Sequence, residues 1–129
     1  MAAGVIDIGS NSIKLLIGEA ADGDIMILES LKNILPIGRA TFLKGYITQE
    51  PINLTINILE KYKKVLADYN ITQVFVIATT AVREATNRHI FADTVRRKTG
   101  FEIEILNVDR RIQSRVRLCR RVRLRILQT

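Results

Sequence analysis

The segment Val5-Ile6-Asp7-Ile8-Gly9-Ser10-Asn11-Ser12 is the most informative part of this chain. An apolar run carries Asp7 near its end, a glycine and three small polar residues follow, and a second apolar run begins at Ile13. This pattern predicts a strand, a tight polar turn and a second strand. The turn would place a carboxylate, hydroxyl groups and backbone N–H groups at one opening, an arrangement that suits a phosphate or a metal-bound phosphate.

The residues around this segment predict three consecutive strands. We expect strands over residues 2–8, 13–20 and 25–34, and the Ala21-Asp22-Gly23-Asp24 cluster is typical of a hairpin turn. Because short turns join antiparallel neighbours, the three strands should form an antiparallel meander.

A long amphipathic helix is predicted after the strands. Thr48 is expected to cap its first turn, and Asn70 is expected to end it. Apolar residues recur along this segment at steps of three and four, which places them on one face of a helix: Ile52, Ile56, Leu59, Tyr62, Leu66 and Tyr69.

The remaining part of the main body predicts a strand, a helix and a strand. Residues 74–78 form a continuous apolar run, as in a strand buried on both faces. A loop is expected over 79–81 and a helix over 82–98, with an interruption near Asn87 left open. Residues 102–106 alternate polar and apolar side chains as a strand does. The predicted order is βββαβαβ, an α/β fold whose last two strands are parallel.

The net charge of +7 is carried by the C-terminal segment. Residues 110–129 hold eight arginines and no acidic residue, so the other 12 basic and 13 acidic residues, all in 1–109, give a net charge of −1. We therefore expect a folded lobe over 1–109 and an arginine-rich tail over 110–129. Two interpretations of the tail stay open: an arm that binds polyanions, and a segment translated out of frame.

The composition argues against several classes of protein. No segment is long and apolar enough to cross a membrane, and the N-terminus lacks the basic flank of a secretory signal. Cys119 is the only cysteine, which excludes an internal disulfide and favours a cytoplasmic location. His89 is the only histidine and has no Cys/His cluster around it, so no zinc site is expected. Trp is absent, which disfavours nucleic-acid binding outside the tail.

The turn after Asp7 has two interpretations. In the functional one, Gly9 lets the backbone approach a phosphate closely, Ser10, Asn11 and Ser12 donate hydrogen bonds to it, and Asp7 orients a metal ion or a water. In the other, the turn is an ordinary hairpin, since Gly, Ser and Asn are common turn residues. The sequence contains neither a Walker-type P-loop nor a G-x-G-x-x-G dinucleotide motif.

A second polar segment follows the apolar run over 74–78. Thr79 and Thr80 supply two hydroxyls at the carboxyl end of a buried strand, and Arg83 lies in the first turn of the expected helix. Ligands of open α/β sheets bind beyond these strand ends, and an arginine can hold a phosphate through two hydrogen bonds. The alternative is that a threonine caps the helix and Arg83 is a solvated charge or the partner of a local acid.

The two segments together resemble the signatures of the Ppx/GppA family, the exopolyphosphatases and guanosine pentaphosphate phosphohydrolases. Residues 5–15 are similar to its first phosphate loop. Residues 78–87 are similar to its second signature, including the Arg-Glu-Ala and the following Asn. The likeness continues through residues 99–106 and covers roughly residues 3–107.

The resemblance implies the first lobe of an actin-like ATPase (ribonuclease H-like) fold: a βββαβαβ mixed five-stranded sheet with helices packed on it, facing a second lobe across a catalytic cleft. It implies hydrolysis of a terminal phosphoanhydride of inorganic polyphosphate, or of guanosine pentaphosphate, with Mg²⁺. Arg83 would be catalytic by neutralising charge on the transferred phosphoryl group, and Asp7 would help to place the Mg²⁺. The implied phosphate-binding residues are Gly9, Ser10, Asn11, Ser12, Thr79 and Thr80.

The sequence departs from the family pattern after residue 106. The family carries Ser-Gly-Glu-Glu-Glu-Ala-Arg there, and one glutamate is the general base, whereas this chain reads Asn107-Val108-Asp109-Arg110-Arg111. No residue can inherit the role of the base, although Asp109 lies nearest in position. The family's second lobe and its phosphate loop also have no counterpart.

We therefore expect a first-lobe fragment that is inactive, or nearly so, by itself and that self-associates through its exposed lobe face. The alternative is a non-catalytic module that binds polyphosphate or nucleic acid through the tail. A third hypothesis is another actin-like ATPase or a sugar kinase. Those proteins do not usually carry the signature found here over residues 78–87, which disfavours this hypothesis.

Overall fold

The computed structural model describes residues 2–106 of the 129-residue chain, with only the backbone described at position 21. The predicted boundary at Asp109, the tail over 110–129 and Cys119 lie outside the described residues. The strands are β1 (Ala2–Ile8), β2 (Ser12–Ala21), β3 (Asp24–Ile34), β4 (Val74–Ala78) and β5 (Ile103–Ile105). The helices are α1 (Ile37–Lys44), α2 (Gln49–Asp68), α3 (Thr80–Glu84) and α4 (Arg88–Thr99).

The five strands form one mixed sheet in the order β3-β2-β1-β4-β5. β1, β2 and β3 are antiparallel neighbours, which confirms the predicted meander. β5 lies parallel to β4, as predicted for two strands joined by a helix, and β4 also lies parallel to β1. The carboxyl ends of β1, β4 and β5 therefore meet at one end of the sheet.

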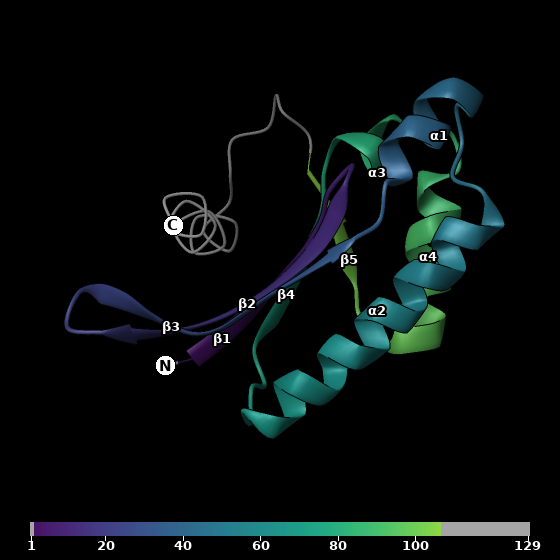
Figure 1. Ribbon diagram of the computed structural model, residues 1–129. Coiled ribbons are helices and arrows are strands. Elements are labelled where there is room, and N and C mark those ends of the chain that lie inside the picture. Colours follow the sequence, from purple (N-terminus) through teal and green to yellow (C-terminus); the bar gives the residue numbers. More distant parts are fainter. Residues whose placement is uncertain (1, 107–129) are drawn as a thin grey trace.

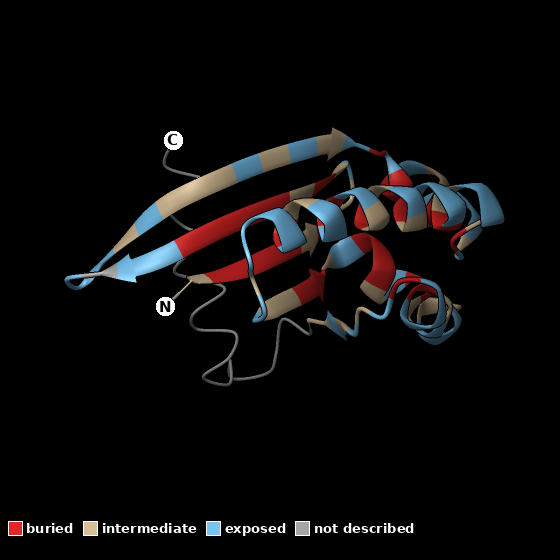
Figure 2. Cartoon of the chain, turned by 90° about the horizontal axis from the view of Figure 1, so that it is seen from below, coloured by how far each residue is buried: buried red, intermediate tan, exposed pale blue. Residues whose placement is uncertain are grey.

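The long helices α2 and α4 cover one face of the sheet, and the short helices α1 and α3 lie at its upper end in Figure 1. The middle parts of β1, β2 and β4 are buried, whereas β3 at the edge alternates between exposed and partly buried residues (Figure 2). Ile77 of β4 is 2% exposed although its neighbours Val76 and Ala78 point to the helices, which agrees with the predicted burial of β4 on both faces. Within the described residues, no helix is both long and apolar enough to span a bilayer.

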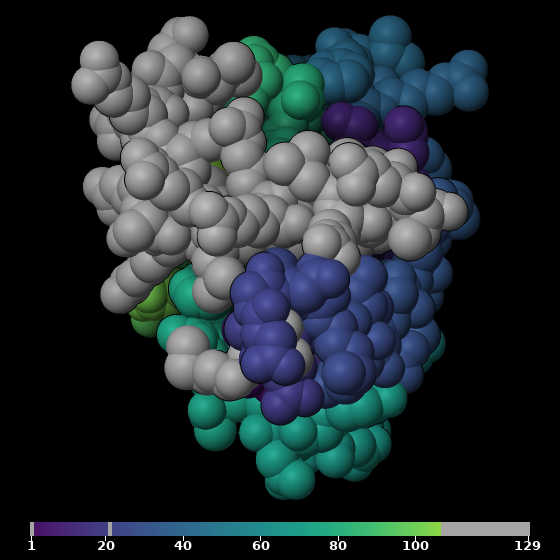
Figure 3. Space-filling view, turned by 90° about the vertical axis from the view of Figure 1, so that its left-hand side faces the viewer, coloured from purple at the N-terminus to yellow at the C-terminus, as the bar shows by residue number. Residues whose placement is uncertain are grey.

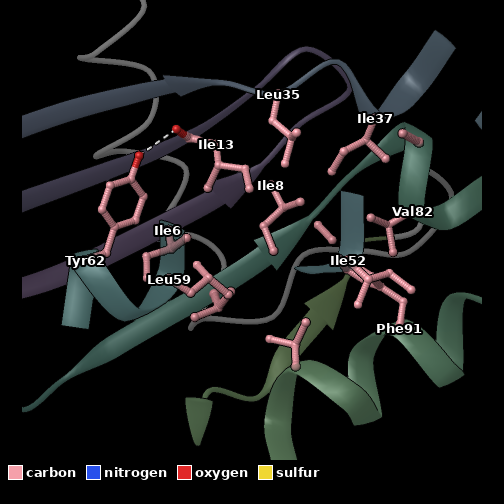
Figure 4. Close-up of a cluster of buried hydrophobic side chains, with 14 of the residues drawn as sticks. Ile6, Ile8, Ile13, Leu35, Ile37, Ile52, Leu59, Tyr62, Val82 and Phe91 are labelled. Carbon is pink, nitrogen blue, oxygen red and sulfur yellow. Dashed lines mark hydrogen bonds between the residues drawn. The ribbon is translucent and has the colours of Figure 1, made fainter. Parts of the chain in front are cut away.

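The core lies between the sheet and the helices. Ile6 and Ile8 of β1 and the alternate residues of β2 beginning at Ile13 point into it, as the period of two in a strand requires. Leu59 and Tyr62 of α2 pack against them (Figure 4). Each fully buried aliphatic side chain of this kind contributes about 1.5 to 3 kcal/mol to the hydrophobic stabilisation.

A buried hydrogen bond joins α2 to the sheet. The Tyr62 hydroxyl donates to the carbonyl oxygen of Ile13 at 2.8 Å (Figure 4) and also lies 2.7 Å from Asn33 Oδ1. Burial raises the pKa of the Tyr62 phenol to about 12, against a smaller opposite effect of a backbone hydrogen bond from Asn33. The neutral hydroxyl therefore stabilises the native packing.

Helix α1 is absent from the sequence-based prediction. Its segment lacks an apolar stripe, because Phe42 and Leu43 are 55% and 82% exposed while the buried positions are Ile37, Gly38 and Thr41. The helix ends at Gly45, whose φ of 81° is left-handed and whose N–H donates to the carbonyl oxygen of Thr41. Contacts with the rest of the fold, rather than periodicity, decide this helix.

The predicted helical stretch over 82–98 forms two helices, and the interruption near Asn87 that the sequence left open is present. α3 ends at Glu84, Ala85 is extended with ψ of 136°, and α4 begins at Arg88. The predicted loop over 79–81 is also too long, because Thr80 already belongs to α3. Just after this break, the Asn87 side chain makes two hydrogen bonds to the distant backbone of Ile47.

Candidate functional site

The turn between β1 and β2 is a tight loop at the end of the sheet. The N–H of Gly9 donates to the carbonyl oxygen of Ser12 at 2.9 Å, which closes the turn. A Cβ atom at position 9 would lie 3.2 Å from that same oxygen, so a larger residue would crowd the turn. Asn11 is exposed at the apex, and Ser10 and Ser12 are partly buried. The predicted hairpin geometry is confirmed.

Helix α1 and the residues before it hold this loop from one side. The N–H of Leu35 donates to the carbonyl oxygen of Asn11 at 3.0 Å, and the N–H of Gly38 donates to that of Ser10 at 2.8 Å. Among residues 2–106, no backbone carbonyl accepts from the N–H of Ser10 or Asn11. The loop carbonyls are thus engaged inside the fold, while these two N–H donors can serve a bound anion.

The segment after β4 lies beside this loop. The N–H of Thr79 donates to the carbonyl oxygen of Ile8 at 3.2 Å, so the parallel ladder brings Thr79 next to the start of the turn. Thr79 occupies the position before α3 but makes no side-chain hydrogen bond that caps the helix. The alternative in which a threonine caps this helix therefore holds for the position of Thr79 but not for a side-chain hydrogen bond. Thr80, the first residue of α3, is exposed. With five residues, α3 is too short for its N-terminus to form an anion site by itself.

Arg83 is anchored at the same end of the sheet. Its Nη1 donates to the carbonyl oxygen of Leu106, just beyond β5, at 3.2 Å. Its Nε lies 3.4 Å from Glu84 Oε1, and the Arg83 side chain is 23% exposed. The alternative in which Arg83 pairs with a local acid is thus present in the structure, although an ion pair of this exposed kind contributes little stability. The guanidinium still has further donors with which to meet a ligand.

Asp7 and Lys14 are cross-strand partners in the antiparallel pair of β1 and β2. The strand neighbours of Asp7 and of Lys14 point toward the helices. Because successive side chains of a strand point to opposite faces, Asp7 and Lys14 lie on the face of the sheet away from the helices. One oxygen of Asp7, Oδ1, is buried, and Lys14 is partly exposed. Lys14 was not among the residues predicted from the sequence, although the alternation of side chains in a hairpin puts Lys14 and Asp7 on the same face.

The oxygen donors at the end of the sheet that carries the loop after β1 fit Mg²⁺ only in part. The described residues contain no group of three or more His, Cys, Asp or Glu side chains that could hold a metal ion. Asp7 and the serine hydroxyls supply oxygen donors, which Mg²⁺ prefers, and Mg²⁺ often binds through one or two carboxylates together with waters and substrate phosphates. Asp7 can therefore be one ligand of such an ion but not a complete site.

The fold brings together all the predicted phosphate-binding residues and leaves His89 apart. The loop after β1 and helix α3, which follows Thr79 and carries Arg83, lie at the carboxyl ends of the central strands, next to α1 (Figure 1). The space-filling view shows purple N-terminal atoms beside blue atoms of α1, with green atoms of the α3 region at the same end (Figure 3). His89 is an exposed residue of α4, as predicted.

Comparison with known proteins adds to this geometry. Residues 5–110 match the model of the Ppx/GppA phosphatase family. Exopolyphosphatase 1 of Mycobacterium tuberculosis is 32% identical over 107 residues, which cover 82% of this chain and 31% of that protein. The crystal structure of the Aquifex aeolicus Ppx/GppA family member matches with a TM-score of 0.79 and 31% identity, over 84% of this chain and 36% of that chain.

An exopolyphosphatase from Cytophaga hutchinsonii matches with a TM-score of 0.77 and 26% identity, over 82% of this chain and 34% of that chain. The chain thus spans about a third of the length of these relatives.

Proposed function

This chain belongs to the Ppx/GppA phosphatase family and has the first lobe of its actin-like ATPase fold, and we propose that this lobe is the phosphate-binding half of a phosphoanhydride hydrolase. Its ligand is the terminal phosphate of inorganic polyphosphate or of guanosine pentaphosphate. The loop over 9–12 holds the phosphate through N–H and hydroxyl donors, with Thr79 and Thr80 beside it. Arg83 neutralises charge on the phosphoryl group.

One observation carries this proposal. The hydrogen bond from Thr79 N–H to the carbonyl oxygen of Ile8 puts the two signature segments side by side at one end of the sheet. The N–H donors of Ser10 and Asn11 and the guanidinium of Arg83 are the groups that bind phosphate oxygens most strongly in proteins. Their meeting at the carboxyl ends of parallel strands is where α/β sheets bind ligands.

Mg²⁺ belongs to the proposal as a cofactor, with Asp7 as one direct or water-mediated ligand. Bound there, it would offset the negative charge of the phosphates, as divalent ions do in phosphoryl transfer. Lys14, the cross-strand partner of Asp7, adds a positive charge on the same face of the sheet.

We further propose that the 129-residue chain by itself hydrolyses polyphosphate slowly. In the family an acidic cluster supplies the general base, and residues 107–111 stand in its place here. Loss of one proton-transfer group typically lowers the rate about 10²- to 10⁴-fold. Turnover by the purified chain at the rate of a full-length relative would contradict this part of the proposal.

The phosphate-binding part is tested by titrating tripolyphosphate into the chain in a calorimeter. Asn11→Asp adds one negative charge at the exposed apex of the loop with little change of shape, and Asn57→Asp adds the same charge on the exposed surface of α2. We expect about tenfold weaker binding for Asn11→Asp alone, since like charges near a protein surface repel by roughly 1 to 4 kcal/mol at close range. Equal affinities of the two variants would overturn the proposal.

A second candidate function follows from the segregation of charge. The eight arginines of residues 110–129 suit a non-catalytic polyanion-binding role toward polyphosphate or nucleic acid. Replacing all eight by glutamine in the full chain should then flatten the dependence of affinity on salt, while the effect of Asn11→Asp persists. An unchanged salt dependence would exclude the role of the arginines.

A further inference from the structure

Helix α1 touches the phosphate-binding loop at one end and the segment after Arg83 at the other. At its start, Leu35 and Gly38 donate backbone hydrogen bonds of 3.0 and 2.8 Å to the loop carbonyls of Asn11 and Ser10. The fit is close, because a Cβ atom at position 38 would lie 2.8 Å from the Cβ atom of Ser10. The loop therefore follows any movement of the first turn of α1.

The other end of α1 is tied to the residues between α3 and α4. The N–H of Thr86 donates to the carbonyl oxygen of Gly45 at 2.8 Å. The side chain of Asn87 then makes two hydrogen bonds to one residue: its Oδ1 accepts from the N–H of Ile47 at 2.9 Å, and its Nδ2 donates to the carbonyl oxygen of Ile47 at 2.8 Å. Ile47 is 2% exposed, so these backbone groups have little access to water.

This arrangement links the two halves of the candidate site through a short helix. Arg83 lies in α3, four residues before Asn87, whose amide joins the end of this segment to Ile47. α1 and α3 also pack against each other. α1 and its two sets of hydrogen bonds thus form a second link between the Ser10 loop and the segment that carries Arg83, besides the hydrogen bond from Thr79 to Ile8.

We propose that Asn87 is a positioning residue, which acts through α1 to hold the Ser10 loop and Arg83 at the spacing that one phosphate group requires. This inference rests on the proposed function, since it assigns the spacing to phosphate binding. An amide is needed because one side chain must both accept from and donate to the same backbone residue. Aspartate keeps the acceptor and loses the donor, and alanine loses both.

The test uses the full 129-residue chain with Asn87→Ala, Asn87→Asp and two controls. Val95→Ala removes methyl groups from a fully buried position on α4, away from α1, and so lowers stability without touching the proposed link. Asn57→Ala removes an exposed amide on α2. Tripolyphosphate affinity is measured by calorimetry, thermal stability by circular dichroism, and the backbone amide signals of Ser10 and Asn11 by ¹⁵N NMR without ligand.

We expect Asn87→Ala to weaken tripolyphosphate binding roughly tenfold or more, because small misplacements of binding groups are costly, and Asn87→Asp to fall between it and the unmodified chain. The Ser10 and Asn11 amide signals should shift in both variants. Val95→Ala should lose stability and keep both affinity and amide signals. The Asp variant also covers the case in which the Ala variant does not fold.

Two results would overturn the inference: unchanged Ser10 and Asn11 signals in Asn87→Asp, or an equal loss of affinity in Val95→Ala. Different results would show that the proposed phosphate-binding function is wrong. In that case the unmodified chain does not bind tripolyphosphate, or Asn11→Asp has no effect, whereas the ligand-free amide shifts still report whether Asn87 positions the loop.

Discussion

The N–H of Gly38 donates a 2.8 Å hydrogen bond to the carbonyl oxygen of Ser10, which seats the first turn of α1 directly on the loop after β1. No side chain fits between the two backbones. A Cβ atom at position 38 would lie 2.8 Å from Ser10 Cβ and 3.2 Å from both the Ser10 oxygen and the Phe42 ring. Glycine is thus required here for the close approach of two segments, and not for an unusual backbone angle.

Gly38→Ala should therefore destabilise the chain although it replaces glycine within a helix. Helix propensity alone would stabilise the variant by up to about 1 kcal/mol. Overpacking against Ser10 should outweigh this and lower the free energy of unfolding by about 1 to 3 kcal/mol. Urea unfolding followed by circular dichroism measures the difference. Leu43→Ala, at a position 82% exposed on the same helix, is the control and should change little. A gain of stability in Gly38→Ala would contradict the close contact.

Arg83→Lys should weaken tripolyphosphate binding while the fold remains. Lysine keeps the charge but loses the planar pair of donors, and a hydrogen bond to a charged group contributes roughly 1.5 to 3 kcal/mol. We expect about a 10- to 100-fold rise in the dissociation constant measured by calorimetry. Arg97→Lys, an exposed arginine paired with Asp93 on α4, is the matched control. Similar affinities for both variants would remove Arg83 from the site.

Asp7→Asn should reduce metal binding in the presence of phosphate. The amide preserves shape but lacks the negative charge that a divalent cation requires. Mn²⁺ can replace Mg²⁺ as a probe, and the relaxation of water protons reports its binding to the chain with tripolyphosphate. The enhancement should fall in Asp7→Asn and persist in Glu104→Gln, which removes an exposed carboxylate of β5. Retention of the enhancement in Asp7→Asn would exclude Asp7 as a ligand.

Tyr62→Phe should lower stability at neutral pH and change its alkaline dependence. The variant loses the hydroxyl that donates to Ile13, at a cost of about 1 to 2 kcal/mol. In the unmodified chain, burial raises the pKa of Tyr62 from 10.0 to about 12, so the unfolded state releases this proton first. The stabilisation from Tyr62 is therefore complete below pH 10 and is lost as the pH rises toward about 12.

The difference in unfolding free energy between the two chains should accordingly shrink across this pH range, as urea unfolding at successive pH values can show. Tyr46→Phe, at a ring that is 45% exposed, is the control. A constant difference through the alkaline range would mean that the Tyr62 hydroxyl is not held neutral by burial.

Most of the sheet could be predicted because its signals are local. The alternation around Ile13 and Ile6, the turn at Gly9 and the apolar run ending at Ala78 each report strand and burial within a few residues. The apolar stripe along α2 is also a local signal, because its residues recur within each turn of the helix. Asn70, with a left-handed φ of 57°, follows the helix near the predicted end. The candidate phosphate-binding residues followed from the same segments.

The elements that the prediction missed depend on contacts between distant segments. α1 has no apolar stripe and forms where Gly38 meets Ser10, 28 positions away. The break before α4, which the sequence left open near Asn87, coincides with the pairing of Asn87 with Ile47, 40 positions apart. Such pairings leave no periodic pattern in the sequence, because the partner is a backbone group whose position depends on the rest of the fold.

The sequence by itself therefore determined the order of the strands, the long helix and the identity of the two signature segments, since residue type and spacing suffice for these. Only the tertiary structure decided that Thr79 lies against Ile8, that Arg83 reaches Leu106, and that α1 joins the loop to the arginine. The physical reason is that strands and amphipathic helices follow from short-range periodicity, whereas the spacing of a binding site follows from backbone hydrogen bonds between segments far apart in the chain.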